Sequence, residues 1–480
     1  MRHTRLRCLA AATALLATGA AVQAKVRLPH LVGDNMVIQQ QSEARLWGWA
    51  KPGARVRVSA SWAKGATATA TAGGDGRWMV RLATPKASME PQTITFDDGD
   101  KVTVGNVLVG EVWVCAGQSN MEMPVKGFYN CPVDDYNHVV TDAAGSQAVR
   151  SIKVPGVMST RPLDDFEGAW RVGSPQTVGD FSATGYFFAR LVSRTLNIPV
   201  GLVEANKGGS RVESWLDRDN LARHTDEPLD SAAMRKRFRW DFHCPLLWGN
   251  GTFHPILNYT VKGILFYQGC SNVGDPGNRY SERLKLLAEQ WRRDFALGDI
   301  PFYFVQIAPY RYGTDEGDGG ALLREQQWRA STIIPNSAVV PTADAVYPYE
   351  AQQIHPAQKR KVGERLAFTA LNKTYGLKQI ICDAPTFERM TVSGDTAYVR
   401  LARLEGGINR LEGLEGFEVA GDDRVFHKVT ATYSPGRGVV ITSPKVSRPV
   451  AVRYCFRNFA LGNVANQGGL PLVPFRTDNW

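Results

Sequence analysis

A serine that follows directly after an apolar strand is the first group in this chain whose position suggests chemistry. Residues 112–116 are apolar, and Gly117, Gln118 and Ser119 come next. A serine at such a strand-to-helix turn lies at the top of a parallel sheet, where its hydroxyl can attack a carbonyl and its backbone N–H can join an oxyanion hole. A glycine and a serine at this spacing also occur in ordinary turns and helix caps, so the assignment needs partners elsewhere. We therefore take Ser119 as the candidate nucleophile.

Groups that could complete an oxyanion hole occur in two later segments. The apolar strand predicted over residues 200–205 leads to Gly208 and Gly209, and paired glycines allow backbone N–H groups to approach a ligand closely. A second run of apolar residues ends in Gln268 and Asn272, whose amide N–H groups can donate to the same oxyanion. We expect Gly209, or its neighbour Gly208, and one of the two side-chain amides to act as donors.

A histidine at a predicted helix start is the candidate general base. Pro356 suits the first helical position, and apolar residues follow it at helical spacing, Val362 and Leu366 among them. His254 also precedes a proline, but no comparable helical pattern follows it. An imidazole with its ordinary pKa of ~6.5 accepts a proton at neutral pH and can return it to a leaving group. The predicted base is therefore His355.

In their order along the chain, four motifs resemble the sialate O-acetylesterase family of SGNH hydrolases. They read GQSNM around Ser119, GGS followed by Glu213 and Trp215, YQGCSN from Tyr267, and IHPAQKRKVGERLA from Ile354. The resemblance continues over these ranges: 28–49, 75–82, 101–113, 414–426, 449–454 and 469–478. It implies an α/β fold, an SGNH-hydrolase-like parallel sheet flanked by helices, with an N-terminal β-sandwich domain and a C-terminal β-rich segment. It also implies a serine carboxylic ester hydrolase that removes O-acetyl groups.

Two departures from the family pattern concern the mechanism. Family members commonly read YQGESN, whereas this chain has Cys270 in place of the glutamate. Many SGNH hydrolases carry an aspartate shortly before the histidine, but Gln352 and Gln353 stand there. The carboxylate that orients the imidazole in a serine triad could instead be Asp344, at the end of a predicted strand, or Glu350 in the following loop. We favour Asp344 because a strand end holds a side chain more firmly, and a Ser-His dyad without an acid is the third possibility.

Periodicity divides the chain into four segments. Residues 1–24 have a basic start, an apolar stretch and small residues at the end, the pattern of a cleaved signal peptide. Residues 25–106 contain short β-like runs separated by Gly, Pro and Asp turns, which predict a β-sandwich. Over 107–376 apolar strands alternate with helices such as 278–297, which predicts a parallel sheet with helices on both faces. Residues 377–480 return to β-like runs that either fold alone or join the N-terminal part.

Composition indicates an exported enzyme without a membrane span. Removing the three arginines of the leader, which contains no acidic residue, changes the formal net charge from +10 to +7. This excess could attract anionic glycans, although a basic surface is also common in proteins with no such partner. No stretch approaches the ~20 apolar residues of a membrane span, and no interleaving of basic and aromatic residues indicates nucleic-acid binding. The predicted location is therefore periplasmic or secreted.

Six cysteines follow the leader, an even number that permits disulfides in an exported chain. Cys115 lies within an apolar strand and is predicted to be a buried thiol. The candidate disulfides are Cys131 with Cys244 and Cys382 with Cys455. Neither CxxC spacing nor a histidine cluster indicates a metal site, so we expect no metal and no cofactor.

The function predicted from these observations is hydrolysis of O-acetyl esters on a glycan partner through an acetyl-enzyme at Ser119. The sugar could be sialic acid, as the family name suggests, or an acetylated plant-wall hemicellulose such as xylan or xyloglucan. A catalytically decayed esterase scaffold that only binds carbohydrate is the alternative, prompted by Cys270 and the absent aspartate. A lipase or thioesterase of the same fold is disfavoured, because the flanking β-rich segments and polar loops suggest glycans.

Overall fold

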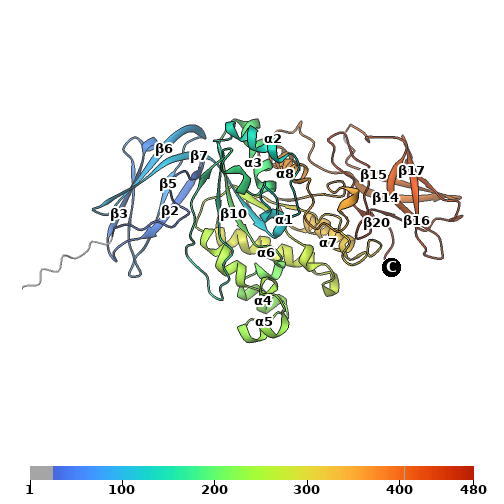
Figure 1. Cartoon of the computed structure of the whole chain (residues 1–480), viewed down its shortest axis with the longest axis horizontal. Coiled ribbons are helices and arrows are strands. Elements are labelled where there is room, and N and C mark those ends of the chain that lie inside the picture. Colours follow the sequence, from blue (N-terminus) through green and yellow to red (C-terminus); the bar gives the residue numbers. More distant parts are fainter. Residues whose placement is uncertain (1–24, 405) are drawn as a thin grey trace, which may run out of the picture.

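The computed structural model describes residues 25–404 and 406–480, so the predicted leader over residues 1–24 lies outside the described residues. Figure 1 shows three parts in a row: an N-terminal β part, a central α/β part with all the long helices, and a C-terminal β part. The central part lies between the other two. The two β-rich ends of the chain therefore do not form one unit.

The N-terminal part consists of two β layers that share a core. Its strands are β1 (Val37–Gln39), β2 (Glu43–Trp49), β3 (Arg55–Ala60), β4 (Thr67–Thr71), β5 (Arg77–Ala83), β6 (Ser88–Asp97) and β7 (Lys101–Gly117). β2 pairs only with β5, whereas β3 pairs with β4 and β6, and β6 and β1 pair with β7. Buried and exposed residues alternate along β5, and its Trp78 packs 5.8 Å from the ring of Phe96 in the other layer. The alternation found in the sequence therefore places one face of each layer inside.

Strand β7 joins the N-terminal part to the central part. It is 17 residues long, and its first half pairs with β6 and β1 while its second half pairs with β10 and β11. The boundary predicted between residues 106 and 107 falls inside this strand. Because one continuous strand serves both parts, the N-terminal layer is hydrogen-bonded to the same strand that carries Ser119 at its end.

The central sheet has the order β13-β12-β11-β7-β10-β8-β9. Its further strands are β8 (Val149–Lys153), β9 (Arg171–Val172), β10 (Val200–Asn206), β11 (Gly263–Tyr267), β12 (Phe302–Val305) and β13 (Ser337–Val340). All neighbours are parallel except β8 and β9. The strands β10, β11 and β12 are buried at every residue, as expected for a parallel sheet covered on both faces. The carboxyl ends of these strands therefore meet at one edge.

Helices cover both faces of the central sheet, as the alternating pattern predicts. α3 (Ala183–Leu196) and α8 (Lys359–Lys373) pack on one face, and α6 (Tyr280–Phe295) and α7 (Gly319–Ile333) on the other (Figure 1). α6 confirms the helix predicted over residues 278–297. α3 and α8 approach closely at Gly363, where a Cβ would lie 2.5 Å from a carbonyl oxygen of α3. Four short helices complete the part: α1 (Ser119–Glu122), α2 (Tyr136–Asp142), α4 (Arg218–His224) and α5 (Ser231–Arg237).

The C-terminal part is a separate antiparallel sheet of seven strands in the order β14-β15-β18-β17-β16-β19-β20. Its strands are β14 (Thr386–Ser393), β15 (Thr396–Ala402), β16 (Leu414–Ala420), β17 (His427–Ser434), β18 (Gly438–Thr442), β19 (Ala451–Tyr454) and β20 (Phe475–Arg476). Arg476 pairs with Glu325 of α7 at 2.9 Å, and Asn458 accepts a hydrogen bond from the Gly320 backbone at 2.7 Å. These contacts attach the sheet to the central part.

Neither of the two candidate disulfides forms. Cys131 and Cys244 are free thiols, and so is Cys455, which excludes its bond to Cys382. The large apolar core makes such cross-links unnecessary. Cys115 is fully buried in β7, which confirms the prediction for that residue. Over residues 25–404 and 406–480, no helix has the length and apolar character of a membrane span, and no metal-binding group of side chains occurs.

Candidate active site

The two residues predicted to act together lie side by side. Ser119 is the first residue of α1, separated from the end of β7 by Gln118, and its Oγ is 2.8 Å from Nε2 of His355. The turn before it needs a glycine, because Gly117 has a φ of 133° and a Cβ there would lie 2.3 Å from the Tyr267 carbonyl oxygen. A buried strand followed by this turn thus presents the serine hydroxyl at the carboxyl edge of the sheet.

His355 lies in the loop before α8 and not at the helix start. The helix begins at Lys359, so the expectation that Pro356 occupies its first position is wrong. The buried stripe predicted from Val362 and Leu366 is confirmed. Asn120 of α1 donates a hydrogen bond to the Ile354 carbonyl at 2.9 Å, which ties the nucleophile helix to the histidine loop. The pair is therefore positioned by two neighbouring segments that hold each other.

The His355 ring is partly buried, and this changes its acid–base behaviour. Burial, and next the nearby ammonium of Lys359, lower its pKa to about 4. Burial likewise lowers the pKa of Lys359 to about 7, and its Nζ donates to the Pro356 carbonyl at 2.6 Å. Phe128 contacts the imidazole edge-on, with the ring centroids 5.2 Å apart. The imidazole is thus neutral at neutral pH and able to accept a proton.

The structure does not bring Asp344 to His355. Both carboxylate oxygens of Asp344 accept hydrogen bonds from Arg365 of α8 at 2.7 Å, and Lys361 lies 3.6 Å away. Although burial alone would raise the pKa of Asp344, the hydrogen bonds and charge of Arg365 lower it below the usual value. The carboxylate therefore ties α8 to the end of β13, a structural contact that the sequence does not distinguish from a catalytic one.

Glu350, the other carboxylate considered for this role, is also engaged elsewhere. It accepts hydrogen bonds from the backbone N–H groups of Tyr347 and Ala357 at 2.8 and 2.9 Å. Its side chain therefore stabilises the loop that carries the histidine. Among the described residues, no aspartate or glutamate hydrogen-bonds or ion-pairs with the imidazole of His355.

The glycine loop after β10 lies against the nucleophile. A Cβ on Gly208 would come within 3.4 Å of the Ser119 Cβ, and the Gly208 N–H donates to Glu122 at 2.7 Å. Gly209 has a φ of 76°, and a Cβ there would lie 2.5 Å from the Phe242 ring. Since the Gly208 N–H is already engaged, Gly209 is the glycine of this pair whose N–H donates to no group of the described residues.

Gln268 and Asn272, the predicted side-chain donors, form a buried network and do not hydrogen-bond to Ser119. Gln268 donates to the Ser210 carbonyl and to Asn272 Oδ1, both at 2.9 Å. Asn272 donates to Glu213 at 2.9 Å and accepts from the Val212 backbone at 3.0 Å. Their donor groups are therefore already used to join the loops after β10 and β11, so the structure gives them a positioning role.

Buried ion pairs complete this network. Glu213 is fully buried and pairs with Arg283 of α6 and with Arg211 at 3.3 Å. Arg211 also pairs with Glu227 at 2.8 Å. Charges at such depth are stable only when they are paired and hydrogen-bonded, as these are. The network fixes the loop that delivers Gly209.

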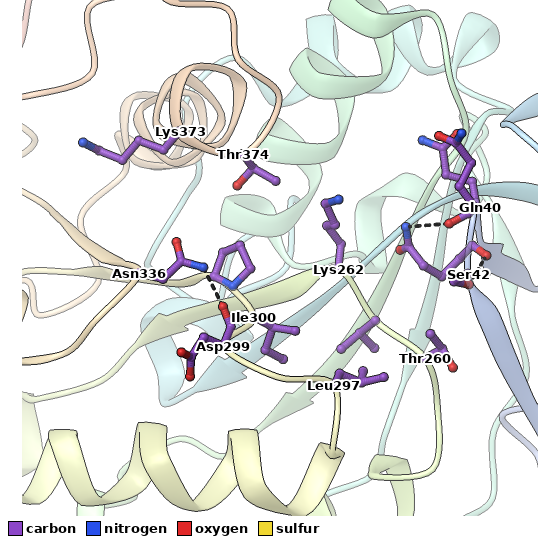
Figure 2. Close-up of a pocket in the computed structure, with 14 residues that line it drawn as sticks. Gln40, Ser42, Thr260, Lys262, Leu297, Asp299, Ile300, Asn336, Lys373 and Thr374 are labelled. Atoms are coloured by element: carbon purple, nitrogen blue, oxygen red, sulfur yellow. Dashed lines mark hydrogen bonds between the residues drawn. The ribbon is translucent and has the colours of Figure 1, made fainter.

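A cavity at the other edge of the sheet is separate from this site. Its volume is about 500 Å³, and Figure 2 shows Lys262, Ile300 and Asn336 lining it, each shortly before β11, β12 or β13. Gln40, which follows β1, lines the opposite wall. The cavity therefore lies at the amino ends of the strands, whereas Ser119 lies beyond the carboxyl end of β7.

Comparisons with known proteins agree with this geometry. The family described as "Carbohydrate esterase, sialic acid-specific acetylesterase" matches residues 109–372, more than half of the chain. The chain belongs to this family of carbohydrate esterases. Sialate O-acetylesterase of Homo sapiens is 27% identical over 400 residues, 76% of this chain and 74% of that protein. The enzyme of Mus musculus is 27% identical over 432 residues, 78% of each chain.

A solved structure extends the likeness to the whole described fold. A carbohydrate acetylesterase from Xanthomonas citri matches 95% of this chain and 100% of its own, with a TM-score of 0.83 and 33% identity. The predicted family membership is thereby confirmed, and this member of the family is an ester hydrolase. Its α/β part and its separate C-terminal antiparallel sheet fit that assignment.

Cys270, which replaces the usual glutamate of this esterase family's YQGESN motif, is not arranged as a nucleophile. It lies in the loop after β11 and is partly buried. Burial raises the pKa of its thiol above the ordinary value, although the charge of Lys359 acts in the opposite direction. Because the thiolate is the reactive form, a raised pKa makes the thiol less reactive.

Two residues beside His355 carry no sequence signal of such a place. The sequence suggests Cys131 for a disulfide and has Gln353 where an aspartate is common, yet both lie next to the histidine. Cys131 Sγ is 4.0 Å from His355 Nδ1 and donates to Gln353 Oε1 at 3.2 Å. No local pattern marks a cysteine in the turn after α1 as the neighbour of a histidine so far away in the sequence.

Proposed function

We propose that this esterase removes O-acetyl groups from glycans through an acetyl-enzyme formed on Ser119. The observation that carries the proposal is the 2.8 Å separation between Ser119 Oγ and His355 Nε2. At that distance Nε2 accepts the hydroxyl proton while Oγ attacks the acetyl carbonyl, which compensates for the weak nucleophilicity of a neutral serine. His355 then returns the proton to the departing sugar oxygen, and water, deprotonated by the same nitrogen, releases acetate and restores Ser119.

The oxyanion that develops on the acetyl carbonyl accepts hydrogen bonds from the backbone N–H groups of Ser119 and Gly209. Neither N–H donates to another group of the described residues. One preorganised donor of this kind typically contributes about 3 kcal/mol to lowering the barrier. The buried network around Glu213 supports this role indirectly, because it holds the loop of Gly209 in place before substrate binds.

An exposed aromatic side chain lies on the histidine side of the site. Tyr129 is 93% exposed and directly follows Phe128, the residue whose ring contacts His355. A tyrosine so exposed adds nothing to the core, whereas its face can stack on the apolar face of a sugar ring. This arrangement supports a glycan as the carrier of the acetyl group.

A second aromatic surface lies on the glycine side. Trp240 is 47% exposed and stacks on Phe242, with ring centroids 5.8 Å apart and planes at 8°. Phe242 in turn covers Gly209. Because Tyr129 follows a residue that contacts His355, whereas Trp240 stacks on the residue that covers Gly209, the substrate we propose is a sugar chain longer than one ring. Acetylated xylan or xyloglucan fits this better than a single O-acetylated sialic acid.

We also propose that the esterase is exported, to the periplasm or beyond, where it would meet such glycans. The pattern of residues 1–24 supports this. The alternative, a decayed scaffold that only binds carbohydrate, is disfavoured by the hydrogen-bonded distance between Ser119 and His355. Carbohydrate binding alone does not require a serine and a histidine at hydrogen-bonding distance.

Acetate release from a panel of esters tests the proposal. The panel contains O-acetylated sialic acid, acetylated xylan and xyloglucan oligosaccharides, and an aryl acetate as a substrate without sugar. We expect acetate from the oligosaccharides with a higher kcat/KM than from sialic acid, and none from any substrate with Ser119→Ala. Binding of these glycans without acetate release would establish the decayed scaffold instead.

A further inference from the structure

The Nδ1 side of His355 faces a thiol. Cys131 Sγ lies 4.0 Å from Nδ1, on the side of the ring opposite Ser119. The tight turn from Phe128 to Cys131 positions this sulfur, because the two residues exchange backbone hydrogen bonds of 3.0 and 2.9 Å. In a serine triad a carboxylate occupies the corresponding place and holds the imidazole by its Nδ1–H. Here the position is held by Cys131.

The side-chain amide of Gln353 fixes both the thiol and the histidine. Its Oε1 accepts from Cys131 Sγ and from the His355 backbone N–H, both at 3.2 Å, and its Nε2 donates to the Asn130 carbonyl at 3.2 Å. Because the thiol proton points to Oε1, a sulfur lone pair is left for Nδ1–H. Sulfur is a weak acceptor, but a chain of hydrogen bonds from Nδ1 through the thiol to the amide strengthens each member.

We propose that Cys131 and Gln353 are the positioning residues of His355, a neutral thiol–amide pair that keeps the proton on Nδ1 and the Nε2 lone pair directed at Ser119. The inference rests on the proposed roles of Ser119 and His355. It assigns to two uncharged side chains the orienting role that a carboxylate has in a serine triad, but without its charge. The imidazolium formed during the reaction then has no carboxylate beside it.

The absence of a neighbouring carboxylate has a measurable consequence. The charged group that faces the ring is Lys359 from α8, which itself faces Glu350 and Asp134, and burial together with Lys359 holds the pKa of His355 near 4. The acid limb of kcat/KM reports this pKa in the free enzyme. A negative charge placed at Nδ1 favours the imidazolium, so it raises the pKa of His355 and moves the acid limb to higher pH.

Three substitutions at one position test the proposal by acetate release from an aryl acetate across acid and neutral pH. Cys131→Ala removes the contact and should lower kcat about fivefold with KM unchanged, the effect of losing one neutral hydrogen bond. Cys131→Ser can still accept and donate and should retain most of the activity. Cys131→Asp should keep the ring oriented and move the acid limb upward.

A matched pair of substitutions separates the charge effect from general disturbance. Gln353→Glu preserves the shape of the side chain but adds a charge beside the thiol and the histidine. Gln352→Glu adds the same charge on the neighbouring residue, whose side chain is exposed. We expect the acid limb to move to higher pH with Gln353→Glu and to remain in place with Gln352→Glu.

The proposal is overturned if the folded Cys131→Ala and Cys131→Asp proteins both show the wild-type kcat and the wild-type acid limb. The thiol would then serve packing alone. Thermal unfolding shows whether each variant is folded, and if Cys131→Ala is not, the Gln353→Glu and Gln352→Glu pair decides by itself. Activity that survives Ser119→Ala would instead refute the proposed nucleophile, so the two failures are distinguishable.

Discussion

Two loops meet at Ser119 and are stabilised in opposite ways. One, the glycine side, follows β10 and contains Gly209; the other, the histidine side, precedes α8 and contains His355. On the glycine side, Glu213, Arg211 and Arg283 form buried ion pairs that fix the loops after β10 and β11. On the histidine side, the groups that contact the imidazole are a hydroxyl, a thiol and the ring of Phe128. Paired charges thus hold the backbone on the glycine side, whereas among the described residues no carboxylate pairs with the base, and the charged group that acts on it is Lys359.

The difference follows from what each side has to do. Backbone donors to an oxyanion act by being rigid, and buried ion pairs resist displacement because a charge left unpaired in the interior is costly. A general base has to change its protonation state during the reaction, and each neighbouring charge shifts its pKa. The low pKa of His355, about 4, reflects burial and a nearby cation without a compensating carboxylate.

The largest effect on kcat should come from removing the Ser119–His355 hydrogen bond, which joins the two sides. Ser119→Ala and His355→Ala should each lower kcat by ~10⁴-fold or more, because the two side chains act as one unit, and the double substitution should be barely worse than either alone. Acetate release under single-turnover conditions measures this, with thermal unfolding as the check on folding. Losses that multiply in the double variant would show that the residues act separately.

The ion pairs on the glycine side should be needed chiefly for stability. Glu213→Gln removes the fully buried carboxylate that Arg211 and Arg283 share and leaves them only Glu227 and the less buried Asp275, so we expect the free energy of unfolding to fall by about 3–5 kcal/mol. Urea denaturation measures it. The matched control is Glu282→Gln, since Glu282 pairs with Arg329 at the surface with 60% of its side chain exposed, and its loss should cost less than about 0.5 kcal/mol. Equal losses of unfolding free energy in the two variants would mean that burial of the ion pairs does not matter for stability.

Neutralising the two carboxylates that the sequence offers as partners of the histidine should affect the rate little. Asp344→Asn and Glu350→Gln should each lower kcat by less than about tenfold, against the ~10⁴-fold loss known for the aspartate of a serine triad. Asp344→Asn weakens the pairing with Arg365 and should therefore lower the unfolding temperature instead. A large loss of kcat in either folded variant would restore that carboxylate to the role predicted from the sequence.

The smallest effect is expected at Cys270. Its raised pKa keeps the thiol protonated, so Cys270→Ala should change kcat by no more than about twofold. In the wild-type enzyme the acetyl group should be found on Ser119. Mass spectrometry of the enzyme quenched during turnover locates the acetyl group. An adduct on Cys270 would exchange the roles of the two residues.

The roles proposed for Ser119 and Gly209 are accessible from sequence because each depends on a local pattern, whereas the helix start predicted at His355 is wrong. An apolar run followed by a glycine and a serine, or by paired glycines, predicts a strand. It also predicts that the residues after the strand lie at the carboxyl edge of a parallel sheet. The alternation of such strands with helices likewise predicts the α/β part. Each of these patterns extends over only a few neighbouring residues, so a single sequence is enough to recognise it.

What the tertiary structure decided is which distant side chains face one another. Asp344 follows a predicted strand, which suggested it as the triad acid, but Arg365 donates hydrogen bonds to both of its carboxylate oxygens. Cys131 carries no such signature and lies 224 positions before the histidine that it contacts. Contacts of this kind depend on distances set by the packing of whole helices and loops, and residue spacing along a chain does not encode them.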